Sequence, residues 1–142
     1  MKRRSQIQGD IAVRIGQLLE MADVLFCIDR EDPFEVDHLP AVNLTRVSDE
    51  LLEVAGDPSG GAASLSRRLT LSLDLYAEGE SRFGLLDNVE EAVISCLLTL
   101  DPVRTLQADR VSVGASEFEQ ESFLSLVCAT RIPITIDYTI NF

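Results

Sequence analysis

The only histidine of the chain is the side chain best suited to act as a base near neutral pH. His38 follows Asp37 directly, and Glu35 is nearby. A histidine beside a carboxylate is the pairing that hydrolases use to activate a hydroxyl, a thiol or water. No Ser-His-Asp or Cys-His arrangement exists here that does not depend on His38 itself. We interpret it as a surface histidine, and we predict no catalytic residue and no enzyme activity.

Carboxylates gather in the same segment, where they could ligate a divalent cation. The segment lacks the glycine turn and the ligand register of a calcium loop, so we predict a solvated acidic loop and no metal. The sequence contains neither a GxGxxG nor a GxxxxGK[ST] pattern, and we therefore predict no nucleotide or other cofactor. The clustered carboxylates are Asp29, Glu31, Asp32, Glu35 and Asp37.

A second acidic group has the spacing of a strand. Glu117, Glu119 and Glu121 occupy every second position and would project from one face, where three like charges are costly unless water or a partner's cations neutralise them. The group is either a partner contact or a charged hairpin tip that prevents edge aggregation. Other candidate partner contacts lie in and after a stretch rich in Gly, Ala, Ser and Pro: Gly60, Gly61, Arg67 and Arg68.

Length and charge limit the kinds of partner. A chain of 142 residues normally forms one domain, so we expect a single domain over 1–142. The 24 acidic and 12 basic residues give a net charge of -12, which disfavours binding to nucleic acids and to anionic membranes. The three cysteines, Cys27, Cys96 and Cys128, lie far apart in apolar segments and are typical of reduced core residues in an intracellular protein.

These candidate residues are placed by alternating helical and strand patterns. Apolar residues at helical spacing predict helices over 5–21 and over 86–100, the second ending before Pro102. Alternating apolar residues predict strands over 24–28, 39–47, 67–77, 111–115 and 124–140. The stretch 55–66 is predicted to be a long, flexible hairpin loop. We expect an α+β fold of two layers: a mixed, mostly antiparallel sheet of four to five strands with two helices packed on one face.

The order of these features resembles that of the tail terminator proteins of long-tailed phages, typified by the minor tail protein U of lambda-like phages. The resemblance spans nearly the whole chain and depends on the order and spacing of four features. They are the strand opening Leu39-Pro40-Ala41-Val42, the alternating strand from Leu69 to Tyr76, the helix start Leu86-Asp87 and the ending Ile134-Thr135-Ile136-Asp137-Tyr138.

The resemblance implies a structural virion protein without catalytic activity. Such a protein forms a hexameric ring on the end of the tail tube, terminates tail polymerisation and provides the head-joining interface. Its partners would be its own copies, the tail tube protein and a head-completion protein, in the virion tail and, during assembly, in the host cytoplasm. The alternatives are another head-tail neck or tail-completion protein of a phage or prophage, a cytosolic adaptor unrelated to phages, and a hydrolase that uses His38.

Overall fold

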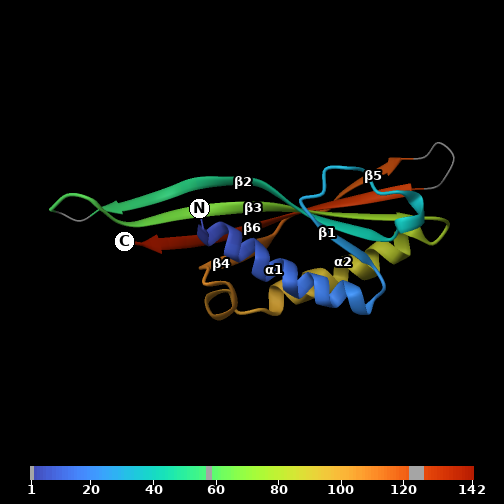
Figure 1. The fold of residues 1–142 in the computed structure, drawn as a ribbon, viewed down its shortest axis with the longest axis horizontal. Coiled ribbons are helices and arrows are strands. Elements are labelled where there is room, and N and C mark those ends of the chain that lie inside the picture. Colours follow the sequence, from blue (N-terminus) through green and yellow to red (C-terminus); the bar gives the residue numbers. More distant parts are fainter. Residues whose placement is uncertain (1, 57–58, 122–126) are drawn as a thin grey trace.

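The computed structural model describes residues 2–56, 59–121 and 127–142, and Figure 1 shows the course of the chain through them. The predicted α+β fold is confirmed, with a mixed sheet and two long helices, α1 and α2, on one of its faces (Figure 1). In chain order the elements are α1 (Lys2–Met21), β1 (Leu25–Ile28), the short helix η1 (Val36–His38), β2 (Ala41–Gly56), β3 (Ala62–Glu78), α2 (Arg82–Thr99), the short helix η2 (Pro102–Leu106), β4 (Arg110–Val113), β5 (Glu117–Glu121) and β6 (Val127–Asn141).

The sheet has six strands in the order β1-β2-β3-β6-β4, and β5 also pairs with β6. All pairs are antiparallel except that of β1 with β2. Four to five strands were expected, and the additional strand is β5, which residues 117–121 form beside the first half of β6. β4 pairs with the second half of β6, so the two short strands share one neighbour.

The core lies between the helices and one face of the sheet. In β3, Leu69, Leu71, Leu73 and Leu75 are fully buried, as the alternating pattern predicts. The helical stripes meet this face, and burying each large aliphatic side chain contributes about 1.5–3 kcal/mol. On the helices the buried residues that pack there include Ile7, Ile11, Ile15 and Leu19 of α1 and Leu86, Val89, Val93 and Leu97 of α2.

The hairpin of β2 and β3 is much longer than expected and extends beyond the helices (Figure 1). Its ladder continues to the pair Gly56 and Ala62, so the loop predicted over 55–66 is wrong for residues 55–56 and 62–66. Small and polar residues suit loops, but their backbone N–H and C=O groups complete a ladder as well as those of larger residues. Gly60 and Gly61 have φ of 99° and 91°, a conformation that glycine adopts without strain, and they lie in the turn.

Pro133 lies where β6 changes its outer neighbour. β5 pairs with residues 127–131 and β4 with residues 134–137, so the proline, which has no N–H to donate, lies between the two ladders. Its carbonyl accepts a hydrogen bond from Gly114 N at 2.8 Å. A Cβ on Gly114 would lie 2.6 Å from the Pro133 ring, so only glycine permits this close approach. Pro133 therefore marks an interruption in the outer ladder.

Candidate interaction surface

The face of the sheet opposite the helices carries polar side chains, and we call it the open face. Its residues alternate with the buried leucines, so Arg68 and Thr70 of β3 belong to it. The pairing register arranges the open face in rows that cross the strands. One row consists of hydroxyls only, namely Ser48, Thr70, Thr135 and Ser112 of β2, β3, β6 and β4.

The next row consists of charges of alternating sign. Glu50 pairs with Arg68, Arg68 with Asp137, and Asp137 with Arg110. Arg68 donates from Nε and Nη2 to the two carboxylate oxygens of Asp137, at 2.7 and 3.1 Å. The hydrogen bonds to Asp137, with a smaller contribution from Glu50, raise the pKa of Arg68. The charges of Arg68 and Asp137, in the middle of the row, neutralise each other. Glu50 and Arg110 are exposed and end the row at opposite edges of the sheet.

A hollow of about 420 Å³ opens on the same face, nearer β5. At its floor, Asp74 accepts from Ser72 Oγ and Arg131 Nε, both at 2.9 Å. Glu117 lies opposite Arg131 in the register and lines the hollow, and Glu119 lies opposite Ala129 on the same face. Glu117 and Glu119 therefore project from one face, as their spacing predicts. The backbone of Glu121 pairs with Val127, but its side chain lies outside the described residues.

Arg67 lies on the other face, where it is already paired within the subunit. Its Nε donates to Asp49 Oδ1 at 2.8 Å, and Arg4 of α1 lies 2.9 Å from the other oxygen of this carboxylate. The hydroxyl of Tyr138 also donates to Asp49, whose side chain is only 2% exposed. The hydrogen bond to Asp49 raises the pKa of Arg67, while burial and then the Asp49 carboxylate raise that of Tyr138 to about 12. Arg4 thus links α1 to the sheet through Asp49, and Arg67 binds the same carboxylate from β3.

The predicted contact residues do not form one site. Gly60 and Gly61 lie at the turn of the hairpin, Arg67 faces the helix side, and Arg68 shares the open face with Glu117. Sequence reasoning missed Glu50 and Arg110, the two free ends of the charge row. Their opposite charges were visible in the sequence, but their common row follows only from the strand register.

The outer edge of β2 is unpaired over most of its length. β1 covers only Ala41–Leu44, and the Asp29 carboxylate then accepts from Arg46 N at 2.8 Å. From Val47 to Gly56, no strand lies beside this edge in the part of the chain that the structure describes. An unpaired edge with exposed apolar side chains is typical of an interface. The large apolar residues exposed there are Val47, Leu51, Leu52 and Val54.

The opposite edge of the sheet is formed by β4 and carries different residues from the β2 edge. β4 pairs with β6 alone among the described strands, so no described strand lies on its outer side. Arg110 begins β4, and the adjacent helix η2 carries exposed Val103 and exposed Arg104. Near this edge the cations Arg104 and Arg110 lie beside the exposed carboxylates of Asp101 and Asp109, whereas the β2 edge combines the carboxylates of Glu50 and Glu53 with apolar surface. The two free edges are therefore unlike, and the residues that end the charge row at each of them, Glu50 and Arg110, have opposite charges.

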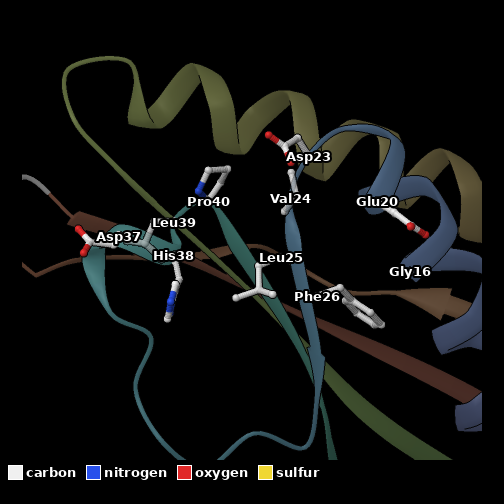
Figure 2. A pocket seen from close by; sticks show the side chains of 10 residues that line it. All are labelled: Gly16, Glu20, Asp23, Val24, Leu25, Phe26, Asp37, His38, Leu39 and Pro40. Carbon is white, nitrogen blue, oxygen red and sulfur yellow. The ribbon is translucent and has the colours of Figure 1, made fainter.

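His38 lines an open cavity of about 700 Å³ between the end of α1, β1 and the segment after η1. Figure 2 shows the carboxylates of Glu20, Asp23 and Asp37 spread around the cavity, not converging on the imidazole ring. No lining residue carries a hydroxyl or a thiol that His38 could activate. The cavity therefore does not bring together a side-chain nucleophile and a base.

The acidic segment 29–37 is held by local contacts. Asn43 accepts from Arg30 N at 3.1 Å and donates to its carbonyl at 2.9 Å, and the Arg30 guanidinium lies 4.6 Å from the centre of the Phe34 ring. Among the described residues, no group of three or more His, Cys, Asp or Glu side chains could hold a metal ion. No helix in the described ranges is long and apolar enough to cross a membrane.

No family model matches the chain, and no curated protein matches it.

Proposed function

We propose that the chain is a structural subunit that assembles into a closed ring on the end of a phage tail tube. The ring terminates polymerisation of the tube and provides the surface that joins the head. The resemblance in the order of sequence features suggests this role. The observation that carries the proposal is that one sheet has two unlike free edges, and that the charge row across it ends in Glu50 at the β2 edge and in Arg110 at the β4 edge.

Unlike edges favour a ring over a dimer. A two-fold dimer places the same surface of each copy together, which here would join carboxylates such as Glu50 and Glu53 to their own counterparts, or Arg110 to Arg110. Head-to-tail contact joins Glu50 at the β2 edge of one copy to Arg110 at the β4 edge of the next. Such contacts close into a ring when the rotation between copies permits it.

The projecting hairpin supports contact with a second kind of protein. Its tip extends beyond the helices and exposes Leu51, Leu52 and Val54, and Phe142 is exposed at the end of β6 (Figure 1). Apolar residues displayed on such an extension are typical of a surface that another protein covers. We assign this tip to contact with the tube or the head.

The test is the mass of the purified chain over a range of concentrations, measured by native mass spectrometry and light scattering and followed by electron microscopy. We expect a closed ring, since heterologous contacts close when the rotation between copies permits it, and the resemblance implies about six copies. Purified tail tubes without terminators should then bind the ring at one end. A dimer at all concentrations would overturn the proposal. A ring that binds the portal side and not the tube would favour a different neck protein.

A further inference from the structure

We propose that the free edge of β2 pairs with β4 of the next copy, with Ser48 opposite Ser112 and Glu50 opposite Arg110 of that copy. The sheet would thereby continue from subunit to subunit. This inference rests on the proposed ring and names the contact that builds it.

The strand register places the two free edges at the same level. Ser48 and Ser112 end the row of hydroxyls, while Glu50 and Arg110 end the row of charges. A closed ring requires that neighbouring copies be related by rotation without translation along the ring axis. With strands that run roughly along this axis, β4 of one copy meets β2 of its neighbour at the level from Ser48 to Glu50.

The free part of β2 begins where this pairing needs it. Asp29 occupies the backbone N–H of Arg46 and so ends the contact with β1 at that point. Val47 is the first residue beyond it, and the edge stays free to Gly56. The four residues of β4 therefore find an open stretch of β2, and no described strand of the same subunit competes for it.

The strand directions give an antiparallel contact. β3 is antiparallel to β2, β6 to β3 and β4 to β6, so β4 and β2 of one subunit run in opposite directions. Rotation about an axis along the strands preserves these directions. The new ladder would therefore be antiparallel, which is the more stable arrangement per residue.

Charge favours this pairing over the alternatives. The row across one subunit reads Glu50, Arg68, Asp137, Arg110, and the next copy adds Glu50 again. Charges of alternating sign would thus continue around the ring. Pairing of β2 with another β2 would oppose carboxylates, and like charges directly opposite each other destabilise a sheet.

The test reverses the two charges separately. Glu50→Arg and Arg110→Glu should each abolish the ring or raise the concentration needed for it by at least about tenfold, because each opposes like charges across the contact. A one-to-one mixture of the two variants should restore rings of alternating subunits, since both kinds of contact then join opposite charges. Glu91→Arg, the same change at an exposed position of α2, should leave the ring intact.

The outcomes separate the interface from the proposed function. Circular dichroism of each variant shows whether the subunit still folds, and a restored ring in the mixture proves that both variants do. Rings that persist in both single variants, or variants that fail alone and are not restored by mixing, would overturn this interface and leave the ring itself standing. A wild-type chain that forms no ring under any condition would overturn both.

Discussion

Asp49 binds side chains from three distant parts of the chain. Arg4 comes from α1, Arg67 from β3 and Tyr138 from β6, and all three reach the same nearly buried carboxylate. A buried charge is tolerated only when it is paired and hydrogen-bonded, and two cations together with a phenol meet this requirement. The cluster fixes the first turn of α1 against the part of the sheet from which the hairpin projects.

The phenol of Tyr138 makes stability depend on alkaline pH. Folding raises its pKa from 10.0 to about 12, so the folded state favours the neutral phenol. The contribution of this phenol to the free energy of unfolding is complete below pH 10 and is lost as the pH rises from 10 to about 12. Over this range we expect the free energy of unfolding to fall by up to about 1.4 kcal/mol per pH unit from this group. Tyr138→Phe should remove that part of the slope, as urea unfolding at pH 9 to 11 would reveal.

Tyr76→Phe is the matched control for this prediction. It removes a phenol from the open face and leaves Tyr138 in place, so the slope due to Tyr138 should remain. Burial also raises the pKa of the Cys128 thiol, which adds to the loss of stability above pH 9 in all three proteins. Equal slopes in wild type and Tyr138→Phe would contradict the assignment of this effect to Asp49 and its partners.

At the level of elements, the turn of the β2–β3 hairpin depends on its two glycines. Gly60→Ala and Gly61→Ala each place a side chain at positive φ, which costs about 1–2 kcal/mol. We expect both variants to unfold at lower urea concentration than the wild type. Gly9→Ala in α1 is the control with the opposite sign, because its Cβ meets open space and alanine stabilises a helix interior by about 1 kcal/mol. A Gly60→Ala variant as stable as the wild type would show that this φ is not required.

The elements with a regular period could be predicted from the sequence, and those without one could not. Leu69, Leu71, Leu73 and Leu75 alternate without interruption, and β3 was found from them. The distal half of β2 was missed because its pairing shifts between Arg46 and Ser48 and again between Leu51 and Glu53. Each shift inserts a residue that reverses the alternation of faces, so no constant period of two remains.

The residues that share the open face could be predicted only in part, because the sequence of one strand does not determine how it is aligned with its neighbours. The alternation of Glu117 and Glu119 shows that they share a face, but their proximity to Arg131 and Asp74 depends on how β5, β6 and β3 are aligned. The same holds for Glu50 and Arg110. Register is determined by turns and by packing against the helices, and neither can be read from one strand alone.

For the whole molecule, the net charge of -12 predicts how assembly depends on salt. Copies of the same sign repel over a distance of about 30 Å at 10 mM salt but only about 8 Å at 150 mM. Contacts such as Glu50 with Arg110 act at close range and are screened less. We therefore expect the concentration at which half of the chains are in rings to fall as salt rises from about 10 to about 150 mM.

Light scattering at several salt concentrations would measure this dependence. The double variant Asp10→Asn and Glu91→Gln lowers the net negative charge at exposed helix positions and should weaken the dependence on salt. A ring that becomes steadily less stable from the lowest salt upward would show instead that attraction between the edges dominates over the repulsion of whole subunits.

Because the β2–β3 hairpin projects at one end only, the two ends of the sheet differ. Its tip lies beyond the level of β4, while the other end of the sheet carries β5 and the segments around Phe34 and Gly79. In a ring of copies that all have the same orientation, the projecting apolar hairpins would lie on one rim, and the other rim would lack them. Such a ring would present one surface to the neighbour below it and a different surface to the neighbour above it.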